Sequence, residues 1–96
     1  MGEKSLLVER HRDAINELGS KHKANSIAVF GSVARGDDTA SSDIDFLVEF
    51  QAGSSLFDLL HFQDALEALL GCEVDVISAG GLTERDAHIR REAIPL

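Results

Sequence analysis

The spacing of apolar and polar residues near the start of the chain predicts an amphipathic helix over residues 5–20. A helix of this kind brings side chains three or four positions apart onto one face. Gly19 and Ser20 are suitable residues for its end. The inward positions that this spacing defines are Leu7, His11, Ala14, Ile15 and Leu18.

Three later segments have the composition of β-strands. Residues 26–30, 44–50 and 73–78 are short runs rich in β-branched and aromatic residues, and each is bounded by glycine or polar residues. The first of them leads directly into Gly31, which predicts a strand that enters a glycine turn. The second, IDFLVEF, alternates between apolar and acidic positions at its start.

A helix is predicted between the second and third strands. It begins near Ser55, which with Asp58 resembles a capping box, and it ends at Gly71. Its expected inner face comprises Leu56, Leu59, Leu60, Gln63, Leu66 and Leu70.

A last helix is expected from about residue 83 to residue 93, because Pro95 prevents its continuation. Arg90 and Arg91 are expected to form its solvated end. The resulting order is helix, strand, turn, strand, helix, strand, helix. This order and the length of 96 residues predict an α/β (α+β) chain with a single domain over residues 1–96.

Charge is unevenly distributed along the chain. The formal net charge is −8, and the stretch between Arg35 and Arg85 has eleven acidic residues and no Lys or Arg. Such a surface repels phosphate backbones, so direct nucleic-acid binding is not expected. A nucleotide can still bind where divalent cations lie between its phosphates and the carboxylates. The charge pattern therefore favours a metal-dependent site over a basic one.

The chain has no signal for a membrane or for disulfide chemistry. No apolar run approaches the roughly 18 residues that span a bilayer, and the N-terminal segment is charged, so a cytoplasmic protein without membrane contact is expected. Cys72 is the only cysteine, which excludes an internal disulfide and predicts a buried, inert thiol.

The stretch FGSVARGDDTASSDIDFLV, residues 30–48, has the features of a phosphate-binding turn. Gly31 allows a tight turn and close approach of a ligand, Ser32 offers a hydroxyl, and backbone N–H groups at the start of a helix attract anions. Arg35 lies one turn further on. It could contact a phosphate, or it could pair with Asp37 or Asp38, and the sequence leaves both interpretations open.

Three carboxylates are predicted to converge beside this turn. Asp43 and Asp45 lie two positions apart at the start of a strand, so they share one face while the apolar residues between and after them face the core. Asp75 lies between two valines on the third strand and is expected on the same side. Three neighbouring carboxylates repel one another unless cations neutralise them. Each feature alone is ordinary, but together they predict a metal and nucleotide site.

In these motifs the chain resembles the DNA polymerase β-type nucleotidyltransferases, and within them the minimal nucleotidyltransferases, or MNT proteins. The family pattern is Gly-Ser, ten residues, Asp-x-Asp and a later strand Asp, which Gly31, Ser32, Asp43, Asp45 and Asp75 match. The resemblance implies the polymerase β-type nucleotidyltransferase fold, a mixed β-sheet flanked by helices. It also implies that the Gly-Ser turn holds a triphosphate and that Asp43 and Asp45 bind two Mg²⁺ ions. Asp75 would bind one of these ions and help to activate an acceptor hydroxyl.

The resemblance further implies an activity and a partner. Stand-alone MNT proteins are commonly paired with a small helical protein of the HEPN family, and in toxin–antitoxin pairs they add AMP to a tyrosine of the HEPN toxin. The chain has no predicted acceptor-binding domain, so a partner protein would have to supply the acceptor. The alternative is a non-catalytic nucleotide-binding module that neutralises or scaffolds a helical partner by contact. The sequence does not distinguish ATP from other nucleoside triphosphates.

Overall fold

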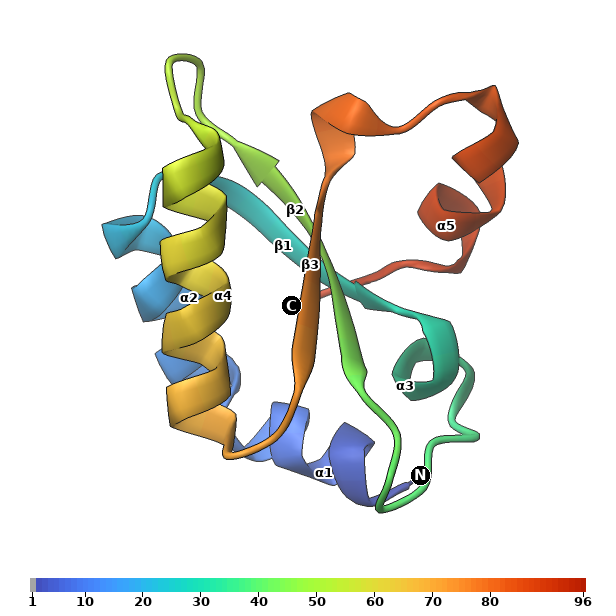
Figure 1. The fold of residues 1–96 in the computed structure, drawn as a ribbon. Helices are drawn as coiled ribbons and strands as arrows, with labels where there is room; N and C mark the ends of the chain where they lie inside the picture. The colour runs from blue at the N-terminus through green and yellow to red at the C-terminus, as the bar shows by residue number, and fades with distance from the viewer. Residues whose placement is uncertain (1) are drawn as a thin grey trace.

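The computed structural model describes residues 2–96 and contains a four-stranded mixed β-sheet (Figure 1). The strands lie in the order β3-β2-β1-β4, with β2 antiparallel to β1 and parallel to β3, and β4 antiparallel to β1. This arrangement confirms the predicted fold class. The strands are β1 (Ala24–Phe30), β2 (Ile44–Phe50), β3 (Val74–Ser78) and β4 (Ile94–Pro95).

Helices cover the two faces of the sheet differently. Helices α2 and α4 pack against one face, whereas α5 lies on the other side (Figure 1). Helix α3 contacts α5, but its buried residue Val33 belongs to the cluster formed with α2 and α4. The helices are α1 (Glu3–Arg10), α2 (Arg12–Lys21), α3 (Gly31–Arg35), α4 (Leu56–Leu70) and α5 (Ala87–Glu92), and two short 3₁₀ turns, Ala79–Gly81 and Glu84–Asp86, connect β3 to α5. None of the helices in residues 2–96 is long and apolar enough to cross a membrane.

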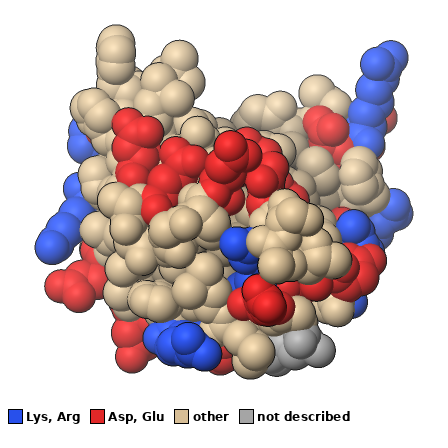
Figure 2. Space-filling model, turned by 60° about the horizontal axis from the view of Figure 1, so that its bottom comes forward, with Lys and Arg blue, Asp and Glu red and all other residues tan. Residues whose placement is uncertain are grey.

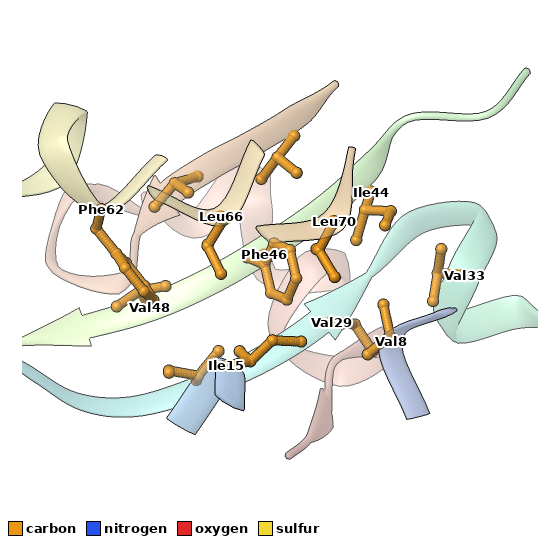
Figure 3. Close-up of a cluster of buried hydrophobic side chains, with 13 residues drawn as sticks. Val8, Ile15, Val29, Val33, Ile44, Phe46, Val48, Phe62, Leu66 and Leu70 are labelled. Carbon is orange, nitrogen blue, oxygen red and sulfur yellow. The ribbon is translucent and has the colours of Figure 1, made fainter. Parts of the chain in front are cut away.

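The alternation of side chains along β2 divides the core into two clusters. Ile44, Phe46 and Val48 are fully buried and pack with α2 and α4 in the larger cluster (Figure 3). Leu47 points to the opposite face, into a smaller cluster that includes Phe30 and also holds Ala79 and Ile89. Because Asp45 alternates with these core residues, its side chain must lie on the second face.

The single helix predicted over residues 5–20 is wrong, because the chain bends at His11 between α1 and α2. The His11 backbone departs from helical geometry, with φ −109° and ψ 15°, although its N–H still bonds the Leu7 carbonyl oxygen at 3.2 Å. No glycine or proline marks this position. The direction of α1 is instead fixed from outside the helix, by Asp38.

Asp38 caps the start of α1 from a distant part of the chain. Its Oδ2 accepts hydrogen bonds from the backbone N–H groups of Lys4 at 2.8 Å and Ser5 at 3.1 Å, and its Oδ1 bonds the Ser5 hydroxyl at 2.5 Å. Burial alone raises the pKa of Asp38, but these hydrogen bonds from Ser5 and Lys4 outweigh it, so the pKa lies below its ordinary value. Asp38 is therefore a structural residue that joins α1 to the segment between α3 and β2.

Replacing Asp38 with alanine is expected to destabilise the protein by about 1–3 kcal/mol at pH 7, because it leaves buried donors without acceptors. A carboxyl with a lowered pKa stabilises the fold above its ordinary value of 3.8, and this contribution is lost as the pH falls through the lower folded-state pKa. The difference in melting temperature between wild type and Asp38→Ala should therefore shrink in acid. Thermal unfolding from pH 7 to pH 3 measures it, and the exposed Asp64→Ala is the matched control.

Helix α4 has the predicted ends but not the predicted inner face. The capping box of Ser55 and Asp58 is present, and Gly71 ends the helix with φ +71°. The buried face contains Phe62, Leu66 and Leu70. Leu56 and Leu60, which were expected inside, are 68% and 43% exposed. Because leucines lie on several sides of this helix, their positions alone do not identify the inner face.

Two polar residues on the inner side of α4 protect the edge of the sheet. The Gln63 side chain accepts a hydrogen bond from the backbone N–H of Val76 at 3.2 Å, and Glu67 accepts one from Val74 at 3.3 Å. These N–H groups lie on β3, one of the two edge strands of the sheet. Unpaired groups on such an edge otherwise attract other strands, so α4 closes this edge.

The C-terminal segment differs most from the prediction. The expected helix over 83–93 is instead a 3₁₀ turn followed by α5, and Pro95 lies in the unpredicted strand β4 opposite Ala28. Proline is tolerated there because β4 is an edge strand. Arg90 is more than a solvated helix end, since its Nη2 donates to the Ala79 carbonyl oxygen at 2.7 Å. Cys72 packs against the core but is only half-buried, so the prediction of a buried thiol is wrong.

Candidate functional site

The Gly-Ser turn lies where β1 passes directly into α3. Phe30, the last residue of β1, is buried, and α3 begins at the next residue, Gly31. Gly31 has φ +70°, a left-handed conformation that strongly favours glycine. Ser32 follows and is half-buried. The turn therefore places a side-chain-free backbone and a hydroxyl at the end of the strand, as the sequence predicted.

Gly31 also makes room for one of the acidic residues. Phe30 pairs with Asp45 in the antiparallel register of β1 and β2. A Cβ atom at position 31 would lie 2.4 Å from Oδ2 of Asp45, so any side chain there would displace this carboxylate. A substitution of Gly31 would thus lower activity in two ways. It would displace the Asp45 carboxylate, and it would obstruct the contact of the backbone with a phosphate. This direct packing could not be predicted from the spacing of the two residues in the sequence.

Asp45 and Asp75 are direct partners on parallel neighbouring strands. They lie opposite each other in the register of β2 and β3, whose backbones are about 4.8 Å apart. Asp43 precedes β2 and is exposed, as is Asp75, whereas Asp45 is half-buried. Burial raises the pKa of Asp45, and the negative charges of Asp75 and Asp43 raise it further. Asp43 and Asp75 therefore lie close enough to Asp45 for their charges to act on it.

Figure 2 shows acidic side chains in a band across a hollow on one face of the molecule, with Lys and Arg side chains outside this band. Within residues 2–96, no three His, Cys, Asp or Glu side chains are already arranged closely enough to hold a metal ion. The metal-binding role of Asp43, Asp45 and Asp75 accordingly remains a prediction.

Arg35 pairs with two carboxylates, and only one of them was expected. Its Nε lies 3.2 Å from Oδ2 of Asp37, and its Nη1 lies 2.6 Å from Oε1 of Glu92 at the end of α5. Asp38, the other partner considered from the sequence, instead accepts a hydrogen bond from the backbone at the start of α1. Glu92 also acts electrostatically on Asp45. Glu92 was not predicted as a partner of Arg35, because no sequence motif links a residue so late in the chain to the Gly-Ser turn.

The family model for the nucleotidyltransferase domain matches residues 8–94, nearly the whole chain. The chain belongs to the nucleotidyltransferase family. A Methanocaldococcus jannaschii protein with the provisional name of protein adenylyltransferase is 38% identical over 76 residues, which cover 79% of this chain and 74% of that protein. The nucleotidyltransferase is thus related to enzymes, and the family membership that its sequence motifs predicted is confirmed.

Solved structures agree with the family. A structure provisionally described as a minimal nucleotidyltransferase has a TM-score of 0.85 and 43% identity to this nucleotidyltransferase, with 100% of this chain and 97% of the other covered. The structure of a tri-AMPylated Shewanella oneidensis HEPN toxin in complex with an MNT antitoxin also matches, with a TM-score of 0.69. That match covers 91% of this chain and 69% of the other at 17% identity, so it supports the fold alone.

Proposed function

We propose that this nucleotidyltransferase uses magnesium to transfer AMP from ATP to a hydroxyl group of a partner protein. The register of Asp45 with Asp75 beside Gly31 is the observation that supports this proposal most strongly. In this proposal the turn at Gly31 receives the triphosphate, the carboxylates bind the cations, and Asp75 lies beside the acceptor. The name of the Methanocaldococcus relative supports AMP as the transferred group and a protein as the acceptor.

The chemistry of the donor set suits a pair of magnesium ions. Carboxylate oxygens are the ligands that Mg²⁺ prefers, and cations would relieve the repulsion that raises the pKa of Asp45. In this proposal Asp43 and Asp45 hold both ions, and Asp75 holds one of them. When bound, the ions would neutralise the triphosphate and favour ionisation of the acceptor hydroxyl.

The protein groups then position the reactants. The backbone at Gly31 allows the triphosphate to approach, the Ser32 hydroxyl donates a hydrogen bond to a phosphate oxygen, and Arg35 adds positive charge at the same end. Asp75 orients the acceptor hydroxyl and helps to remove its proton. The acceptor oxygen attacks the α-phosphorus, the bond to the β-phosphate oxygen breaks, and pyrophosphate leaves. No covalent bond to the nucleotidyltransferase is required.

A HEPN-type helical protein is the partner that we propose, with the nucleotidyltransferase as its antitoxin. The support is the shared fold with the Shewanella antitoxin, whose HEPN toxin carries three AMP groups. In that arrangement the partner supplies the acceptor hydroxyl, and the toxin is neutralised by covalent modification.

Calorimetric titration of ATP tests the metal and nucleotide site. Binding should be measurable in Mg²⁺ and should be lost in EDTA, because the phosphates cannot approach three uncompensated carboxylates without cations. Equally tight binding of ATP in EDTA would exclude the two-metal site.

A further inference from the structure

Arg35 is held from two sides, although its side chain is 53% exposed. Asp37, two residues later, contacts Nε, and Glu92 from the C-terminal segment contacts Nη1. Both carboxylates pair with the same guanidinium, and the residue that carries it ends the short helix that begins at Gly31 and Ser32. A long exposed side chain normally samples many rotamers, so the two contacts restrict where its charge lies.

Glu92 is the better fixed of the two acceptors. Its side chain is 22% exposed, compared with 61% for Asp37. The segment that carries it is anchored on both sides, because Ile89 packs against Phe30 and Ile94 pairs with Val29 of β1. Helices α3 and α5 are neighbours (Figure 1), and the ion pair of Arg35 with Glu92 joins them.

The charges around Arg35 explain why a fixed acceptor matters. Arg35 is the last residue of α3, and Gly31, the first residue of that helix, lies directly against the carboxylate of Asp45. An unrestrained guanidinium near this carboxylate would be drawn into an ion pair with it. The guanidinium would then bind the carboxylate oxygens that the proposed cations need, and it would move away from the Gly-Ser turn.

We propose that Glu92 is a positioning residue that holds Arg35 beside the Gly-Ser turn and away from Asp43 and Asp45. This inference rests on the proposed function, because it assigns Arg35 a place at the phosphate end of that same site. Glu92 itself does not touch the nucleotide. It gives the C-terminal segment a role in nucleotide binding through the contact with Arg35.

The variant Glu92→Gln keeps the shape of the side chain and removes its charge. Its KM for ATP in saturating Mg²⁺ should rise by about 5- to 10-fold, the effect of weakening one charge-assisted hydrogen bond, while kcat changes by less than about 2-fold. The same substitution at exposed Glu84, on the turn before α5, is the matched control and should leave both constants unchanged. An unchanged KM in Glu92→Gln would overturn the inference, as would a fall in kcat alone.

The double variant Arg35→Glu, Glu92→Arg separates positioning from a purely structural ion pair. It should restore the melting temperature relative to the single variants, because the pair is rebuilt, but it should not restore KM, because the positive charge now lies on α5. Recovery of a wild-type KM would show that only the pair matters and would contradict the inference.

A titration with a non-hydrolysable ATP analogue and Mg²⁺ distinguishes this inference from the proposed function. Absence of binding to the wild-type protein would refute the nucleotide site, and the role of Glu92 would fall with it. Binding of the analogue to wild type with an equal affinity for Glu92→Gln would refute only the role of Glu92. We expect binding to both proteins, with the affinity of Glu92→Gln lower by about 5- to 10-fold.

Discussion

Asp45→Asn should lower the rate of nucleotidyl transfer by roughly 100-fold or more, without lowering the stability of the fold. The activity should fall because an amide is a poor magnesium ligand and carries no charge to hold the ions. The stability should be equal or higher, because burial and the charges of Asp75 and Asp43 raise the pKa of Asp45. A carboxyl whose pKa is raised in the folded state destabilises the fold when it is ionised at neutral pH, and asparagine removes that cost. Asp43→Asn should also abolish transfer.

Turnover and thermal unfolding of the same preparations test this pair of effects. The control is Asp64→Asn, an exposed carboxylate on α4 that is expected to change neither quantity. Normal turnover of Asp43→Asn or Asp45→Asn would show that the site is assigned to the wrong residues. A large fall in melting temperature would instead indicate a structural role for the carboxylate concerned.

The second large effect is expected at Asp75, where binding and chemistry should separate. Asp75→Asn should still bind the partner protein but fail to modify it. The side chain of Asp75 is exposed, and its neighbours Val74 and Val76 supply the core packing of β3, so the substitution should leave the surface of the fold unchanged. Without this carboxylate, a magnesium ion would lack one ligand, and the acceptor hydroxyl would lack the group that helps to remove its proton.

Co-purification and intact mass of the partner measure the two parts of this prediction. If Asp75→Asn and Asp43→Asn neutralise the partner as fully as wild type, and no protein adds mass to it, the nucleotidyltransferase acts by contact alone. In that case the non-catalytic binding module replaces the proposed enzyme.

The elements around the site were predictable because their signals are local. The alternation of Ile44 and Phe46 with Asp43 and Asp45 follows from the two-residue period of a strand, and β2 begins and ends where the sequence predicted. The same reasoning places Asp75 between buried Val74 and Val76, as the structure shows.

The features that were missed depend on contacts between distant segments. Strand β4 has two residues, too few for a recognisable pattern, and it exists because β1 offers a free edge. The capping of α1 by Asp38 and the contact of Glu92 with Arg35 join residues 34 and 57 positions apart. The bend at His11 likewise follows from the contact of α1 with Asp38. None of these contacts leaves a periodic signal in the sequence.

Intact mass spectrometry of a HEPN-type partner after incubation with the nucleotidyltransferase, Mg²⁺ and each of the four nucleoside triphosphates tests the central claim most directly. With ATP the partner should gain the mass of one or more AMP groups, and it should gain nothing in EDTA or with Asp45→Asn. An unchanged mass with all four nucleotides, from a wild-type protein that nevertheless binds and neutralises the partner, would contradict the claim.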